Sequence, residues 1–278
     1  MIQQDLSSRQ LVNLIVERLY SHPLNYLKED QISKRRLCRT RASVILLISV
    51  QPEHIHCKNS LVFLLNKRSE RVRQPGDLCC PGGGIHRFLD TLLSRLLCLP
   101  LSPLRRSRGW QEMLKVCPQH ATSLALYLAA ALRESWEEIG LNPFLVEFLG
   151  PLPPYRLKLF RREILPVVGL IRFPTRLRPN WEVERIVYIP LSAFGDETRY
   201  AQYIVNVSDS LKDRVDEDPM HFSCFLYQDG VRAEILWGAT YSIIMSFLKL
   251  VFDFTPPSGS ELNVIRGNIT PEYITGKQ

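Results

Sequence analysis

Short apolar runs separated by polar or proline-containing connections dominate the pattern along the chain. Residues 42–50 (ASVILLISV) and 61–66 (LVFLLN) are continuous apolar runs of strand length, so each predicts a buried β-strand. The stretch 51–53 (QPE) and its neighbours predict the connection between them. Residues 164–173 and 183–189 predict two further strands later in the chain.

Helical spacing of apolar residues appears in three other places. Residues 6–20 predict an amphipathic opening helix, and the Ala- and Leu-rich residues 121–139 predict a long helix that ends at Gly140. Residues 234–252 predict a final apolar helix. The polar residues 256–278 predict a loose tail.

Residues 85–119 form an unusually Leu-rich stretch. Five leucines predict one strongly apolar helical face: Leu89, Leu92, Leu93, Leu96 and Leu97. Pro100 and Pro103 then break the helix, and three arginines follow at positions 105, 106 and 108. A face this apolar favours packing on the core or in a dimer contact. Covering the mouth of a site is an alternative, and so is a membrane-surface role, because Arg95 and the later arginines flank the face.

Composition places the chain among ordinary globular proteins. It has 278 residues, of which 45% are hydrophobic and 23% charged. The net charge of +7 suits an anionic ligand but equally suits basic surface loops. Seven irregularly spaced cysteines make a poor disulfide framework or zinc site. The polar first residues and the lack of about 18 consecutive apolar residues argue against a signal peptide and a transmembrane helix, so we expect a soluble cytoplasmic protein.

The segment with the clearest chemistry is 133–141 (RESWEEIGL). On a helix, Glu134, Glu137 and Glu138 share one face, where their charges repel each other unless a cation lies among them. Mg²⁺ or Mn²⁺ suits such hard oxygen ligands, and the neighbouring Arg133 could orient a glutamate or hold a phosphate. The alternative is a solvated acidic helix end. The helix dipole disfavours negative charge at this end, and the rest of the helix has a buried pattern.

This segment resembles the second half of the Nudix box, G-x5-E-x7-R-E-U-x-E-E-x-G-U, where U is a bulky apolar residue. Residues 133–141 match its fixed positions, with Ser135 in place of the apolar residue. Counting back from Arg133, the pattern's Gly falls on Gln119 and its first Glu on Ala125. A glycine turn does exist at residues 82–84, about 35 residues too early, so we interpret residues 85–119 as an insertion between turn and helix.

Other segments resemble the coenzyme A diphosphatase subgroup of that family. They are residues 64–76 (LLNKRSERVRQPG) with 81–83 (PGG), 164–169 (ILPVVG), 182–184 (EVE) before 188–191 (YIPL), and 235–240 (ILWGAT). Asp77 stands where that group usually has Glu, and Cys80 replaces Phe. The order and spacing of these segments extend the resemblance over most of residues 40–250.

The resemblance implies a fold and an organisation of the chain. The expected fold class is α/β (α+β), a Nudix α/β/α sandwich with a mixed β-sheet between helices. Residues 1–35 are then an N-terminal helical segment, 36–255 the Nudix domain with the insertion at 85–119, and 256–278 the tail.

The resemblance also implies roles for individual residues. Glu134, Glu137 and Glu138 would bind Mg²⁺ or Mn²⁺, and Glu182 is a candidate extra ligand or general base. Gly82, Gly83 and Gly84 would let the backbone approach phosphates. Three arginines, Arg68, Arg71 and Arg73, would bind substrate phosphates through their planar guanidinium groups. For a second basic group near 156–162 we favour simple exposure to water.

The implied reaction is metal-dependent hydrolysis of a nucleoside diphosphate derivative. Coenzyme A or an acyl-CoA is the preferred substrate, giving phosphopantetheine and adenosine 3′,5′-bisphosphate. ADP-ribose, NADH and nucleoside triphosphates are rival substrates, and a catalytically silent domain that senses a nucleotide or binds a protein is a rival function. No nucleic-acid partner is expected, and a homodimer is an open alternative.

Overall fold

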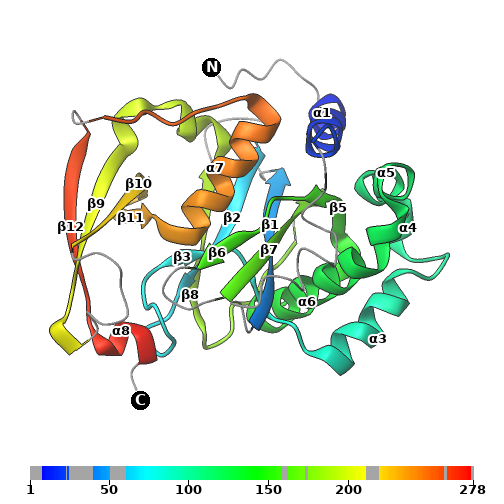
Figure 1. Cartoon of the computed structure of the whole chain (residues 1–278), viewed down its shortest axis with the longest axis horizontal. Coiled ribbons are helices and arrows are strands. Elements are labelled where there is room, and N and C mark those ends of the chain that lie inside the picture. The colour runs from blue at the N-terminus through cyan, green and yellow to red at the C-terminus, as the bar shows by residue number, and fades with distance from the viewer. Residues whose placement is uncertain are drawn as a thin grey trace.

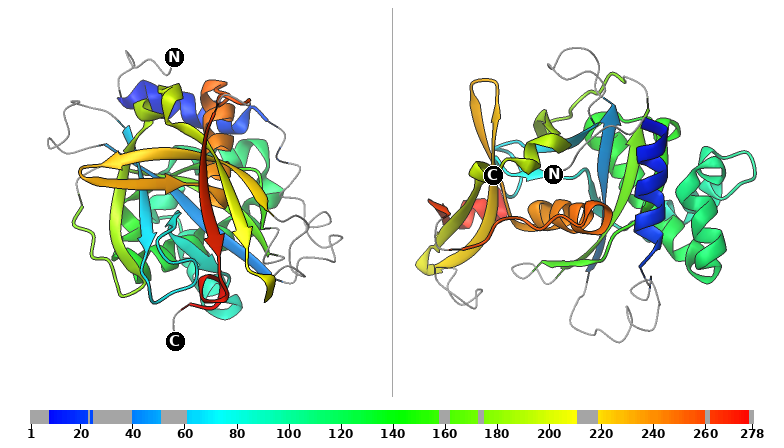
Figure 2. Two further views of the ribbon diagram at one scale, coloured as in Figure 1. Left: turned by 90° about the vertical axis from the view of Figure 1, so that its left-hand side faces the viewer. Right: turned by 90° about the horizontal axis from the view of Figure 1, so that it is seen from above.

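The structure, a computed structural model, describes residues 8–22, 24, 40–50, 61–157, 162–172, 175–210, 219–259 and 262–276. One mixed eight-stranded sheet lies between helices, and a second, four-stranded sheet lies beyond the helix on one side (Figures 1 and 2). The α/β/α arrangement expected from the sequence is therefore present, with an additional sheet that the sequence analysis did not predict. The predicted connection at 51–53 lies outside the described residues.

The larger sheet contains the four strands expected from apolar runs. Its members are β1 (Thr40–Val50), β2 (Leu61–Arg68), β3 (Leu78–Cys79), β4 (Gly82–Gly84), β5 (Val146–Pro151), β6 (Tyr155–Leu157), β7 (Arg162–Ile171) and β8 (Val183–Pro190). The main order is β3-β2-β1-β7-β5, with β4 on β1, β6 on β7 and β8 on β2. Among the strands of this sheet that the structure describes, only β1 and β7 pair in parallel. Residues 42–49 and 61–66 are buried throughout because both faces of the sheet are covered.

Helices cover both faces of this sheet. On one side lie α1 (Ser8–Tyr20) and α6 (Ala121–Ile139), and on the other lies α7 (Gly238–Phe252). A further layer, made by residues of the insertion, packs outside α6, α1 and β5. It contains α3 (Arg87–Leu97), α4 (Pro103–Arg106) and α5 (Arg108–Val116). Short 3-10 helices complete the connections: η2 (Pro118–His120), η3 (Pro143–Leu145), η4 (Leu191–Gly195) and η5 (Glu197–Arg199).

The second sheet corrects two sequence-based predictions. It contains β9 (Tyr200–Val207), β10 (Met220–Asp229), β11 (Arg232–Leu236) and β12 (Asn263–Ile269), in the order β11-β10-β9-β12. The predicted helix 234–252 begins only at Gly238, because residues 232–236 pair with β10 as β11. The predicted loose tail is also wrong for residues 262–276. They form β12, which runs parallel to β9, and the short helix α8 (Pro271–Thr275).

The C-terminal segment is held against the loop that follows β2. The half-buried carboxylate of Asp77 accepts hydrogen bonds from the Tyr273 hydroxyl and from Trp237 Nε1, the latter at 3.0 Å. The Gln74 amide donates to the Tyr273 carbonyl at 2.8 Å. Burial raises the pKa of Asp77 to about 6, and the two side-chain hydrogen bonds offset part of that rise. The C-terminal segment, which the sequence predicted to be a loose tail, is therefore held in place by specific hydrogen bonds from Tyr273 to Asp77 and from Gln74 to Tyr273.

Asp77→Asn is expected to make the free energy of unfolding less dependent on pH. The folded-state pKa of Asp77 is above its ordinary value of 3.8, so the wild type loses stability as pH rises from about 4 through about 6. Asparagine has no such charge. The stability of the variant relative to wild type should therefore increase over this interval, by up to about 3 kcal/mol. Urea unfolding at pH 4 to 7 measures the difference in free energy of unfolding between the two proteins. If this difference stays constant over the interval, the raised pKa of Asp77 is contradicted.

The insertion meets its predicted packing only in part. Leu93 and Leu97 are half-buried, and Leu97 packs on the main core. Leu89, Leu92 and Leu96 remain at least one-third exposed, and Phe88 is more exposed still, so much of the predicted apolar face is open to solvent in the described structure. The breaks at Pro100 and Pro103 occur as predicted, since α3 ends at Leu97 and α4 begins at Pro103.

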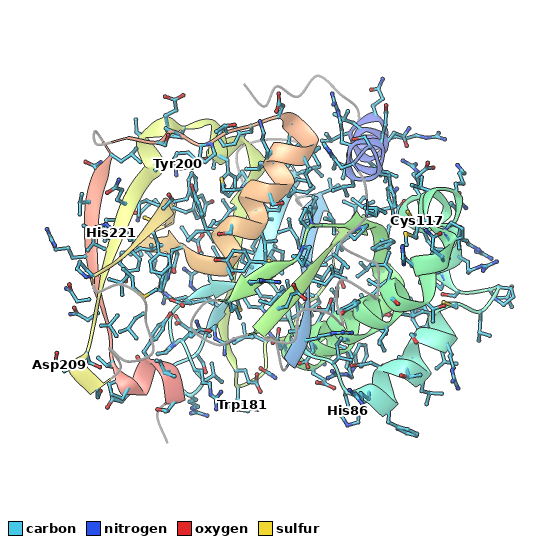
Figure 3. All side chains as sticks on the ribbon, viewed as in Figure 1. His86, Cys117, Trp181, Tyr200, Asp209 and His221 are labelled. Carbon is cyan, nitrogen blue, oxygen red and sulfur yellow. The ribbon has the colours of Figure 1, made fainter. Side chains whose placement is uncertain are left out.

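Two further properties concern cysteines and membrane spans. The described cysteines, at positions 79, 80, 98, 117 and 224, are free thiols. Cys117 on the insertion is labelled in Figure 3. No helix in the described part of the chain is both long and apolar enough to cross a bilayer.

Candidate active site

The site is built at the C-terminal end of α6, where the helix passes the glycine turn of β4. Gly140 closes the helix in the left-handed conformation, with φ of 66°. Ser135, which takes the place of the apolar residue in the Nudix pattern, is fully buried and donates to the Ala131 carbonyl at 2.7 Å. Its hydroxyl group is therefore satisfied inside the helix, and the helix continues unbroken to the glutamates.

Glu138 is the most buried of the three glutamates on α6, Glu134, Glu137 and Glu138. Its Oε2 accepts from Asn66 Nδ2 at 2.9 Å and from the Gly82 amide at 3.4 Å. Burial, followed by the neighbouring charge of Glu134, raises the pKa of Glu138 to about 8, while the Gly82 hydrogen bond and Arg68 lower it. Asn66 Oδ1 is buried with no hydrogen-bond partner among the described residues. A cation beside Glu138 would relieve the cost of its buried charge.

Glu134 lies one turn earlier, directly against the glycine turn. A Cβ atom added to Gly83 would lie 2.5 Å from the Glu134 Cδ and Oε1 atoms, so only glycine leaves room for this carboxylate. Gly82 has a φ of 145°, and its Cβ would lie 2.4 Å from the Ser43 carbonyl oxygen in β1. Burial raises the pKa of Glu134, and the Arg133 charge opposes this rise.

Arg133 connects the cluster to the insertion. Its Nε lies 2.7 Å from Asp90 Oδ1, Nη1 lies 3.0 Å from Glu137 Oε2, and Nη2 lies 3.1 Å from both Glu134 Oε1 and the Gly84 carbonyl oxygen. The hydrogen bond to Asp90 raises the pKa of Arg133 above its ordinary value, so this side chain stays charged. The arginine thus fixes two of the three predicted glutamates, and Glu137 remains half exposed.

Asp90 is the site residue that the sequence analysis missed. Its side chain is fully buried and accepts from the His86 amide at 2.7 Å as well as from Arg133. Asp90 lies six residues after Gly84, which is the G-x5-E spacing of the Nudix pattern with aspartate in place of glutamate. Counting forward from the glycine turn would have found it. The position assigned by counting back, Ala125, is instead a buried core residue of α6.

The insertion therefore interrupts the pattern after Asp90, and the glycine turn still packs against α6. Residues 91–120 separate Asp90 from α6, yet the Asp90–Arg133 ion pair restores the contact in space. We interpreted residues 85–119 as an insertion between the glycine turn and the helix, and the Asp90–Arg133 contact joins Asp90, within that segment, to the candidate site.

Glu182 lies on a separate segment beside the same cluster. Its charge contributes to the raised pKa of Glu138, and its carbonyl accepts from the Ser69 amide at 2.8 Å. Asn180 anchors this segment to the end of α6 through Nδ2, which donates to the Glu137 carbonyl at 3.0 Å. Trp181, between them, is exposed, and it lies with His86 along the lower edge of the molecule in Figure 3.

The three predicted phosphate-binding arginines are placed differently from one another. Arg68 is half-buried. Its Nε donates to the Arg73 carbonyl at 2.6 Å, and its charge acts on Glu138 and Asp77. Arg71 and Arg73 lie exposed in the loop after β2. Arg156 of the second basic group lies 3.6 Å from Glu163, and the rest of that group lies outside the residues whose side chains are described.

The carboxylates suit a hard divalent cation in chemistry, since their donors are oxygens and the burial of Glu138 leaves its negative charge poorly compensated. In the part of the chain that the structure describes, however, no three Asp, Glu, His or Cys side chains converge as a ready metal site. Arg133 holds Glu134 and Glu137 instead. A bound cation would therefore compete with Arg133 for these two carboxylates.

Gly83→Ala is expected to reduce turnover about tenfold while changing the free energy of unfolding by about 1 kcal/mol or less. The new methyl group would displace the Glu134 carboxylate, which is the flexible end of a side chain and can move at small cost to stability. Gly195→Ala, where a Cβ meets no atom within 4 Å, is the matched control. Steady-state kinetics and urea unfolding of both variants measure the two effects. Wild-type kcat in Gly83→Ala would contradict a role for the placement of Glu134.

Comparison with known proteins finds several relatives. The chain is 36% identical over 203 residues to the peroxisomal coenzyme A diphosphatase NUDT7 of Mus musculus, covering 70% of this chain and 66% of that protein. It is 40% identical over 170 residues to the peroxisomal coenzyme A diphosphatase ndx-8 of Caenorhabditis elegans, covering 59% and 55%. Against the mitochondrial Nudix hydrolase 15 of Arabidopsis thaliana it is 30% identical over 130 residues, covering 45% and 42%.

The matched regions thus span between 42% and 66% of these relatives' own lengths. No protein-family model matches the chain. Among solved structures, a MutT/nudix family protein from Enterococcus faecalis aligns over 90% of this chain and 76% of its own, with a TM-score of 0.40 and 13% identity.

Proposed function

Since this chain belongs to the Nudix hydrolase family, we propose that it is a metal-dependent diphosphatase that cleaves the diphosphate bond of a nucleoside diphosphate derivative. The observation that carries the proposal is the packing of Glu134 and Glu138 against the glycine turn. Burial raises the pKa of both carboxylates, which is the environment in which a divalent cation would most stabilise their charged forms.

Mg²⁺ or Mn²⁺ would be held by Glu134 and Glu138, with Glu137 joining once it leaves Arg133. When bound, such an ion would neutralise the diphosphate oxygens and make water a better nucleophile. Glu182 is our candidate for an additional ligand or for the base that accepts the proton from water, because its charge already acts on Glu138. Gly82 and Gly83 would let the backbone approach the phosphates, and Arg68, with Arg71 and Arg73 in the exposed loop, would bind their oxygens.

Coenzyme A or an acyl-CoA is the proposed substrate. Two relatives carry the name coenzyme A diphosphatase, and residues 64–76 and 81–83 resemble the additional motif of that subgroup. Hydrolysis would add water across the diphosphate and release phosphopantetheine and adenosine 3′,5′-bisphosphate. A cytoplasmic location stays a prediction, and the same two relatives are named as peroxisomal.

A panel of substrates tests this proposal. Coenzyme A, acetyl-CoA, ADP-ribose, NADH and dGTP are each incubated with Mg²⁺ and with Mn²⁺, and products are identified by mass. Rapid cleavage of the two CoA compounds to the stated products is the expected result. Preferential cleavage of another compound would retain the reaction and discard the substrate. No cleavage of any compound by folded protein would favour a nucleotide-sensing or interaction domain.

A further inference from the structure

Helix α3 has an inverted distribution of polar and apolar residues. Its two buried residues, Asp90 and Ser94, are polar. The opposite side presents Phe88, Leu92 and Leu96 with exposed fractions of 80%, 48% and 50%. A surface helix of a soluble domain normally buries its apolar side, so this side of α3 is built to contact something outside the described chain.

The apolar surface continues into the turn between α3 and α4. Leu99 is 52% exposed and Leu101 is 84% exposed. This turn projects from the edge of the molecule farthest from the second sheet (Figures 1 and 2). The residues Phe88, Leu92, Leu96, Leu99 and Leu101 are referred to below as the α3 patch. Nearby, Leu97 and Leu104 line an apolar hollow with the exposed Phe144, which extends this surface towards the end of α6.

The charges around the α3 patch have one sign. Four exposed arginines lie on the helices that carry or adjoin it: Arg87 and Arg95 on α3, and Arg105 and Arg106 on α4. None of them forms a salt bridge with a described residue. The acidic residues of segment 85–119, Asp90 and Glu112, are both already paired, with Arg133 and Lys115. The α3 patch is therefore apolar at its centre and positively charged at its border.

We propose that the α3 patch binds peripherally to an anionic membrane surface, with its apolar side chains in the interface and the four arginines at the lipid head groups. This combination is the one that interfacial helices use, since apolar burial and attraction to anionic lipids act together. A second copy of the chain is a poorer occupant, because two such patches would bring like charges together. The attachment is independent of the proposed reaction.

Vesicle flotation tests the proposal with the full chain. The protein is mixed with vesicles of phosphatidylcholine alone, or of phosphatidylcholine with about 30% phosphatidylserine, at about 0.1 M and 0.5 M salt. Binding is expected to the anionic vesicles and to weaken at high salt. The variant Leu92→Ser/Leu101→Ser should bind at least about tenfold more weakly. The variant Arg95→Gln/Arg105→Gln/Arg106→Gln should lose about fivefold for each arginine.

Val231→Ser is the matched control, because Val231 is 96% exposed in the distant turn between β10 and β11. It should bind like wild type. All substituted side chains are exposed, so thermal unfolding should be unchanged and loss of folding would not imitate loss of binding. The proposal is overturned if wild type fails to float with anionic vesicles at low salt. It is equally overturned if the patch variants bind as wild type does, or abolish a dimer without changing vesicle binding.

Discussion

Glu138→Gln is expected to lower kcat by at least about a hundredfold. Glutamine keeps the size of the side chain and can still accept from Asn66 Nδ2, so the local packing survives. It lacks the negative charge that would hold a divalent cation and help to compensate charge in the transition state, and effects of this kind are worth several kcal/mol. The measurement is steady-state kinetics at saturating metal, with single-turnover rates to separate chemistry from product release.

The same variant should be at least as stable as wild type without metal. The folded-state pKa of Glu138, about 8, is above its ordinary value of 4.5, so the wild type loses stability as pH rises from about 4.5 through about 8. Glutamine avoids this loss. Glu147→Gln is a suitable control, because Glu147 pairs with Arg172 on the far part of the sheet and should affect stability rather than kcat. Near-wild-type turnover in Glu138→Gln would contradict the proposed site.

Arg133→Ala is expected to lower the free energy of unfolding by about 3–5 kcal/mol. The reason is Asp90, whose carboxylate is fully buried and would lose its ion-pair partner at 2.7 Å. Glu134 and Glu137 would also lose the guanidinium group that both of them contact, and the repulsion between the two carboxylates would then increase. Urea unfolding measures the effect, and kcat should fall as well because the carboxylates lose their fixed positions.

A double-mutant cycle separates the contribution of the Asp90–Arg133 ion pair to the free energy of unfolding from the other effects of Arg133→Ala. Asp90→Asn combined with Arg133→Ala removes the unpaired charge, so the double variant should be more stable than the sum of the two single losses predicts. A loss of about 1 kcal/mol or less for Arg133→Ala alone would instead indicate an ordinary exposed ion pair.

The main sheet and the long helix α6 could be predicted because their residues are buried in continuous or periodic patterns. Residues 42–49 are buried on both faces, and α6 combines a dense apolar pattern with a glycine end signal. The second sheet could not be predicted in this way. Strand β10 (MHFSCFLYQD) mixes buried, half-buried and exposed positions without strict alternation, and β12 depends on a distant parallel partner, β9.

The site was predictable where its residues are close in sequence. The face shared by Glu134 and Glu138 follows from helical geometry, and the glycine turn was found from its composition. Asp90 was missed because an insertion of helical residues separates it from Arg133, and a pattern of fixed spacing fails across such a gap. The arginine contacts of Glu134 and Glu137 also could not be foreseen, since they depend on side-chain conformations rather than on position along the helix.

The most direct test of the central claim, a divalent cation held by the α6 carboxylates, is a Mn²⁺ titration followed by electron paramagnetic resonance of the free ion. Wild type and Glu138→Gln are titrated side by side, and coenzyme A cleavage is measured in the same samples with and without chelator. The account predicts saturable Mn²⁺ binding by wild type, much weaker binding by Glu138→Gln, and cleavage that follows the bound ion. Equal Mn²⁺ binding by both proteins, or cleavage that persists with chelator, would contradict it.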